Sequence, residues 1–106
     1  MNKILERLDS TIKKKIVESP NNSHTAKLLE KGPEKCAEKF GEEAIELIVA
    51  SIKKKKKDVI SEAADTLYHM CVLLRSKNIS INEVLSELAS REGISGIEEK
   101  RKRNLK

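Results

Sequence analysis

Apolar residues recur every three or four positions along most of this chain, and that spacing is typical of amphipathic helices. It predicts helices over about residues 2–18, 23–29, 33–54 and 58–76, followed by a fifth that begins near residue 80. No segment shows the strict alternation of apolar and polar residues that a half-buried strand requires. We therefore expect an all-α fold, a bundle of about five helices.

Residues that start and stop helices support these boundaries. Ser23 or Thr25 can cap the second helix, and a Gly-Pro step ends it. Pro33 suits the first position of the third helix, because its fixed φ is helical and its missing N–H would have no partner there. Ser80 and Glu83 have the spacing of a capping box at the start of the fifth helix.

The third and fourth helices differ in how much of their surface is apolar. The third carries one inward stripe, formed by Ala37, Phe40, Ala44, Ile45, Ile48 and Ile52. The fourth is apolar over most of its circumference, which is typical of a buried helix. Its apolar positions are Val59, Ile60, Ala63, Ala64, Leu67, Met70, Cys71 and Leu74. The first and fourth helices present more apolar surface than one chain of 106 residues covers, so we expect a homodimer that completes the bundle.

Five carboxylates interrupt these two apolar helices. Glu42, Glu43 and Glu46 fall within one arc of the third helix, and Glu62 and Asp65 lie on the polar stripe of the fourth. If the helices pack antiparallel, the two groups face each other near the helix midpoints. At about 5 Å and an effective dielectric near 20, each pair of like charges repels by roughly 3 kcal/mol. A hard divalent cation, Mg²⁺ or Mn²⁺, would balance such a set of carboxylates.

A simpler interpretation of the acids stays open at this point, namely that they pair with lysines on solvated faces. It fits the triplet on the third helix better than Glu62 and Asp65, because these two are surrounded by apolar positions. His69 continues the polar stripe of the fourth helix. It is a candidate ligand, a candidate base or a core histidine with its hydrogen bonds satisfied.

The chain is basic, with a formal net charge of +5 and a pI near 9.3. The positive charge gathers in a lysine run at 53–57 and in a tail at 100–106. An anionic small-molecule substrate and a nucleic acid are both consistent with this charge. One Tyr, one Phe and no Trp leave no aromatic residues interleaved for base stacking, which disfavours nucleic-acid binding.

Cys36 and Cys71 lack metal-type spacing and fall at apolar helical positions, so we expect reduced core residues. The sequence shows no secretory signal and no apolar run of about 18 residues. We therefore expect a cytoplasmic protein without a membrane partner.

The acid pattern and several flanking motifs resemble one known family. The matching segments are Gly41-Glu42-Glu43-Ala44-x-Glu46, Glu62-x-Ala64-Asp65-x-Leu67-Tyr68-His69, Ser23-x-Thr25-Ala26-Lys27-Leu28 and Lys31-Gly32-Pro33-x-Lys35. Together they resemble the phosphoribosyl-ATP pyrophosphohydrolases, which catalyse the second step of histidine biosynthesis and belong to the MazG-like, all-α pyrophosphohydrolases. The resemblance covers about residues 3–92. It implies a catalytic domain over 1–92. Residues 93–106 lie beyond the resemblance, and their charge and lack of a periodic apolar face predict a basic, flexible tail.

The resemblance also implies a reaction and a site. The reaction is hydrolysis of phosphoribosyl-ATP between its α- and β-phosphates, with Mg²⁺ or Mn²⁺ as the cofactor. The implied metal-binding and catalytic residues are Glu43, Glu46, Glu62 and Asp65, with Glu42 as a flanking candidate. The candidate substrate-binding residues are Ser23, Thr25, Lys27, Lys31, Lys35, Lys39 and His69. Position 24 is usually tyrosine in that family, whereas this chain has His24.

Two other functions use the same observations. A house-cleaning pyrophosphatase for dNTPs or modified nucleotides would have the same acid geometry. A small basic helical protein that binds nucleic acid or a partner helix would explain the net charge without catalysis.

Overall fold

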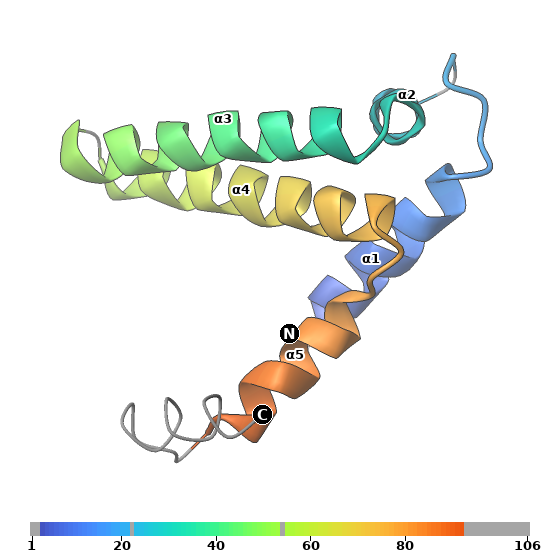
Figure 1. Cartoon of the computed structure of the whole chain (residues 1–106). Coiled ribbons are helices and arrows are strands. Elements are labelled where there is room, and N and C mark those ends of the chain that lie inside the picture. Colours follow the sequence, from blue (N-terminus) through green and yellow to red (C-terminus); the bar gives the residue numbers. More distant parts are fainter. Residues whose placement is uncertain (1–2, 22, 54, 93–106) are drawn as a thin grey trace.

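The structure is a computed structural model that describes residues 3–21, 23–53 and 55–92. All regular secondary structure in these residues is helical, in agreement with the expected all-α class (Figure 1). The five helices are α1 (Lys3–Lys15), α2 (His24–Lys31), α3 (Pro33–Lys53), α4 (Lys56–Ser76) and α5 (Ile81–Ser90). None of the described helices is long and apolar enough to span a membrane.

The two longest helices, α3 and α4, lie side by side and antiparallel, and we call this pair the hairpin (Figure 1). Its tip is the connection between Lys53 and Lys56. Its base is the opposite end, where α2 packs on α3 and α1 packs on α4. Helix α5 leaves the base of the hairpin and contacts α1 (Figure 1). The tip half of the hairpin therefore extends beyond the other helices.

The core lies at the base of the hairpin. Its buried side chains come from all five helices and are Ile12, Leu28, Cys36, Cys71, Val72 and Ile81. Cys36 and Cys71 are free and buried, as expected. Burial raises the pKa of both thiols, which keeps them protonated and unreactive.

The local signals place the helix ends well. Ser23 caps α2, because its hydroxyl accepts a hydrogen bond from the N–H of Ala26 at 3.2 Å. Gly32 ends α2 with φ of 97°, a conformation that side chains rarely adopt, and Pro33 then opens α3. Ser80 forms the expected capping box at the start of α5.

Three expectations about the helices need correction. Helix α1 ends at Lys15. The residues that follow form turns, in which the N–H of Ile16 and of Glu18 each bonds to the carbonyl oxygen three residues earlier. Helix α4 begins two residues earlier than expected, at Lys56. The expectation that α4 is buried on all sides was wrong, since Ile60 is 60% exposed and Leu67 is 43% exposed. The cause is the short base: α1 covers α4 only near its C-terminal half.

The apolar stripe of α3 is also more exposed than expected. We use the name hairpin apolar face for the large apolar side chains that are exposed on α3 and α4. The face consists of Ile45, Ile48, Val49, Ile52, Ile60 and Leu67. The predicted flexible tail over 93–106 lies outside the described residues.

Candidate active site

Three carboxylates from the two hairpin helices meet where α3 and α4 pack together. Glu43 of α3 and Glu62 and Asp65 of α4 each offer an oxygen, and these atoms lie within 4.8 Å of one another. We call these three residues the acid cluster. Glu43 is buried, Glu62 is half-buried and Asp65 is exposed, so the cluster opens toward solvent on one side. The antiparallel packing thus brings together acids that lie on opposite sides of the connection between α3 and α4 in the sequence.

A hydroxyl group fixes the two helices at this level. Thr66 Oγ1 lies 2.8 Å from the carbonyl oxygen of Glu62 and 3.2 Å from that of Glu43. Its single proton is shared between a bond within α4 and a bond across to α3. The sequence analysis did not single out Thr66, because a threonine on a helix usually bonds only to its own preceding turn.

Glu46 lies one turn from Glu43 on α3 and interacts electrostatically with Glu43 and Glu62. Hydrogen bonding to Glu43 and the charge of that carboxylate raise the pKa of Glu46, and the charge of Glu62 adds to the increase. Unlike Glu43, Glu46 is exposed. The structure therefore places all four predicted acids near one another, with Glu46 at the exposed edge.

Glu42 points to a different partner. Its carboxylate is 3.8 Å from Lys39 Nζ, and its side chain is 55% exposed. Lys39 also approaches Glu43, at 3.4 Å, and so offers one positive charge to the acid cluster. Glu42 is outside the three-residue acid cluster, and its role as a flanking ligand stays a prediction.

Two buried polar atoms near the acid cluster have no hydrogen-bond partner within the described part of the chain. They are Oε2 of Glu62 and Nδ1 of His69. Buried polar atoms are nearly always paired, so each orphan marks a place where a ligand or a solvent molecule completes the structure. Because Glu62 is also a member of the acid cluster, its free oxygen is suited to a cation.

His69 is buried, at 8% exposure, below the acid cluster on α4. Burial lowers its pKa, while the charges of Glu43 and Asp65 act in the opposite direction. Burial is the larger influence, so the pKa of His69 is lowered and the neutral imidazole is favoured. His69 thus sits within the electrostatic reach of the acids, as the polar stripe of α4 predicted.

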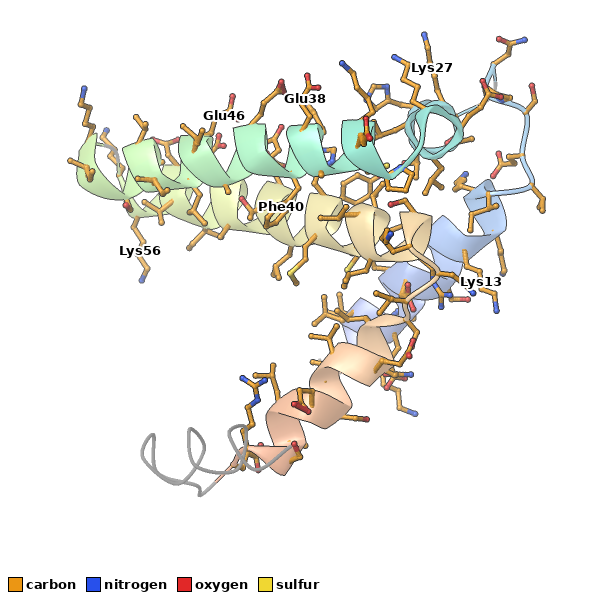
Figure 2. The ribbon with its side chains drawn as sticks, in the orientation of Figure 1. Lys13, Lys27, Glu38, Phe40, Glu46 and Lys56 are labelled. Atoms are coloured by element: carbon orange, nitrogen blue, oxygen red, sulfur yellow. The ribbon has the colours of Figure 1, made fainter. Side chains whose placement is uncertain are left out.

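Helix α2 carries another part of the predicted site. Ser23, His24, Lys27, Glu30 and Lys31 line an open hollow of about 590 Å³ that runs along α2. Figure 2 shows Lys27 projecting outward from this helix. Thr25 has the opposite orientation: it is buried, and its hydroxyl hydrogen-bonds to Tyr68 of α4.

Lys35 completes the set of predicted residues. Its ammonium group is 3.2 Å from the carboxylate of Glu38, one turn along α3, and both side chains are about half exposed. This pair is a surface ion pair of a common kind. Nothing brings Lys35 to the acid cluster in this structure.

Comparison with known proteins identifies the family to which this chain belongs. A model of the family described as phosphoribosyl-ATP pyrophosphohydrolase matches residues 5–92. The chain belongs to this family. The match includes all of the acid cluster, the hollow beside α2 and the core. It also agrees with the all-α, MazG-like fold expected from the sequence.

Individual members of the phosphoribosyl-ATP pyrophosphohydrolase family are similar to the chain over nearly its full length. A protein named phosphoribosyl-ATP pyrophosphatase from Dinoroseobacter shibae is 54% identical over 100 residues, which cover 94% of this chain and 98% of the relative. Proteins with the same name from Paracoccus denitrificans and Ruegeria pomeroyi are 54% and 53% identical, and each alignment covers at least 92% of both partners.

Proposed function

We propose that this chain hydrolyses phosphoribosyl-ATP to phosphoribosyl-AMP and pyrophosphate, the second step of histidine biosynthesis. Family membership supports the reaction, and relatives that share about half of the sequence carry the corresponding name. The observation that carries the proposal is the convergence of Glu43, Glu62 and Asp65 within 4.8 Å across two helices. Such a set of acids is suited to a reaction that needs a cation beside phosphate oxygens.

The residues present fit a hard divalent cation. The acid cluster offers oxygen ligands only, which suits Mg²⁺ or Mn²⁺. Within the described residues Glu62 Oε2 is buried without a hydrogen-bond partner, and the pKa of Glu46 is raised by hydrogen bonding to Glu43 and by the charges of Glu43 and Glu62. Glu43, Glu62 and Asp65 would hold the ion, with Glu46 at the edge. Bound there, a divalent cation would neutralise phosphate charge and lower the pKa of a water molecule.

The protein's own residues would orient the polyphosphate and move a proton. Lys39 is 3.4 Å from Glu43 and can donate hydrogen bonds to a phosphate placed beside the acid cluster. Glu46 is exposed beside the acid cluster, and its carboxylate is a candidate general base. It can therefore accept a proton from the attacking water. His69 lies within electrostatic range of Glu43 and Asp65.

The hollow beside α2 is suited to the end of the substrate that does not react. Ser23, Lys27 and Lys31 line it, and phosphoribosyl-ATP carries a phosphate on its second ribose. Lysines bind phosphate as mobile point charges, so their exposed side chains need not be fixed before the substrate arrives. Lys35 would contribute by attraction over distance, because its nearest partner is Glu38.

We further propose that two copies of this chain pair through the hairpin apolar face. Its members include Ile45 at 62%, Ile48 at 58% and Ile52 at 75% exposure, which is unusual for so many large apolar residues on two adjacent helices. Two copies of an antiparallel helix pair can form a four-helix bundle around a twofold axis and bury the same face on both sides. Ile45, Ile48 and Ile52 lie on the same helix as Glu43 and Glu46, so this pairing would join the two copies through a helix that carries part of the site.

The experiment that tests the reaction is release of pyrophosphate by the purified chain. Phosphoribosyl-ATP should be hydrolysed with a kcat/KM at least about a hundredfold above that of any dNTP. A preference for dNTPs would replace the proposal with the house-cleaning activity. Growth of a histidine-requiring strain that lacks this step, when it is supplied with this chain, would test the same reaction in cells. The cytoplasmic location stays a prediction.

A further inference from the structure

Two hydroxyl groups join α2 to α4. Thr25 Oγ1 and Tyr68 OH hydrogen-bond to each other, although 43 residues separate them along the chain. Thr25 is 9% exposed and Tyr68 is half-buried, so water competes poorly for this bond. Burial also raises the pKa of Tyr68, which keeps its hydroxyl protonated and able to donate.

On the α2 side, the bond holds the inner face of a helix whose outer face lines the hollow. Thr25 and Ala26 are buried against the rest of the molecule, whereas Ser23, His24 and Lys27 line the hollow. The helix has only eight residues, so it has little packing area with which to hold its own position. A directional bond from Thr25 therefore has a large share in fixing where the basic side chains of α2 lie.

On the α4 side, Tyr68 is followed in sequence by His69, which lies within electrostatic range of the acid cluster. The ring of Tyr68 meets the imidazole of His69 edge to face, with centroids 5.0 Å apart and planes at 85°. The pKa of His69 is in turn influenced by Glu43 and Asp65, and also by His24 on α2. The Thr25–Tyr68 bond thus spans the boundary between the hollow beside α2 and the acid cluster.

We propose that the Thr25–Tyr68 hydrogen bond is a positioning contact that sets the separation between the α2 hollow and the acid cluster, so that one phosphoribosyl-ATP molecule reaches both. This inference rests on the proposed function, because it takes the hollow as the binding place of the end that does not react. Thr25 and Tyr68 act through the helices that they join. The hydroxyl of Thr25 thereby has a structural partner, and contact with the substrate falls to Ser23, Lys27 and Lys31.

The proposal predicts which kinetic constant changes when the bond is lost. In this proposal the α2 hollow binds the end that does not react equally strongly in the ground state and in the transition state, which is uniform binding. Loss of this binding raises KM and leaves kcat nearly unchanged. Damage to the acid cluster itself would instead lower kcat, so the two effects can be told apart.

The test compares five proteins: the unaltered chain, Tyr68→Phe, Thr25→Val, the double variant of these two changes, and Thr25→Ser. Each single change removes one hydroxyl and keeps the shape of the side chain. KM for phosphoribosyl-ATP should rise about fivefold to tenfold in each single variant, the effect of one hydrogen bond, while kcat stays within about twofold. The double variant should be no worse than either single variant, because both changes remove the same bond. Thr25→Ser keeps the hydroxyl and should restore most of the KM.

A second measurement separates positioning from general damage. The rise in melting temperature on adding Mn²⁺ should be equal in all five proteins, because none of the changes touches the acid cluster. An unchanged KM in Tyr68→Phe would overturn the proposal, as would fully additive effects in the double variant or a parallel loss of kcat and of the Mn²⁺ effect. An unaltered chain that releases no pyrophosphate from phosphoribosyl-ATP would reject the proposed function itself, before any variant is compared.

Discussion

Asp9 of α1 and Arg75 of α4 form a two-bond ion pair at the base of the hairpin. Asp9 Oδ1 accepts from Arg75 Nε at 2.7 Å and Oδ2 accepts from Nη2 at 2.8 Å, and both side chains are nearly buried. Oδ2 also accepts a bond from the backbone N–H of Ile81, the first residue of α5, at 3.2 Å. One carboxylate therefore ties three helices together.

Breaking this pair should cost much of the stability of the fold. Asp9→Asn leaves the Arg75 charge buried without its counter-ion, and we expect a loss of about 3 kcal/mol in the free energy of unfolding. Chemical denaturation monitored by circular dichroism measures it. The matched control is Glu18→Gln, which breaks the half-exposed Lys15–Glu18 pair and should cost less than about 1 kcal/mol. Equal losses in the two variants would contradict the central role of Asp9.

Activity should depend on a divalent cation. Removal of metal by exhaustive EDTA treatment should abolish turnover and lower the melting temperature, because an ion held by the acid cluster stabilises only the folded state. Adding Mg²⁺ or Mn²⁺ should restore both, and Ca²⁺ offers a comparison with a larger ion. Full turnover after EDTA treatment would contradict the dependence on a divalent cation held by the acid cluster.

Glu62→Gln and Asp65→Asn should each lower kcat by about a hundredfold or more without changing the helical circular dichroism spectrum. Each change removes one charge from the acid cluster and leaves the size of the side chain unchanged. Glu87→Gln on α5 is a matched control, because that carboxylate is exposed and far along the chain from the cluster. Turnover near that of the control in either variant would remove α4 from the site.

Glu46→Gln should stabilise the metal-free protein near neutral pH while it reduces turnover. The pKa of Glu46 is raised by Glu43 and Glu62, so its carboxylate form is disfavoured in the folded state relative to the unfolded chain. A raised acid pKa means that the folded chain binds more protons, so stability falls as the pH rises through the carboxylate range. The amide removes this penalty. Thermal melts in EDTA between about pH 4 and pH 7 should show a smaller decline in the variant, and identical curves would contradict the repulsion.

The sequence predicted the features that depend on local spacing. The capping box at Ser80 and the start of α3 at Pro33 follow from residues a few positions apart, and the facing of the two acid groups follows from the short connection between α3 and α4. Contacts between distant segments have no such pattern. Thr25 and Tyr68 are 43 residues apart, and Asp9 and Arg75 are 66 apart.

Hydrophobic periodicity also has a limit that this chain illustrates. The repeat of Ile45, Ile48 and Ile52 predicted a buried side of α3, but these side chains are 62%, 58% and 75% exposed. The pattern is the same whether another part of the same chain or a second copy covers that side. For this reason the sequence predicted burial of residues that one copy leaves exposed.

The exposed hairpin gives a direct test of pairing between two copies. Ile52 is 75% exposed on α3, so Ile52→Glu should not disturb the fold of one copy. In a dimer that buries the hairpin apolar face, the same change places a charge in an apolar contact, which is strongly unfavourable. We expect the unaltered chain to have the mass of a dimer by light scattering and Ile52→Glu to shift toward the monomer at the same concentration. Val17→Glu is the control, because Val17 is 89% exposed and follows α1, away from the hairpin. A variant at Ile52 that stays as dimeric as this control would show that the hairpin apolar face is not the contact between copies.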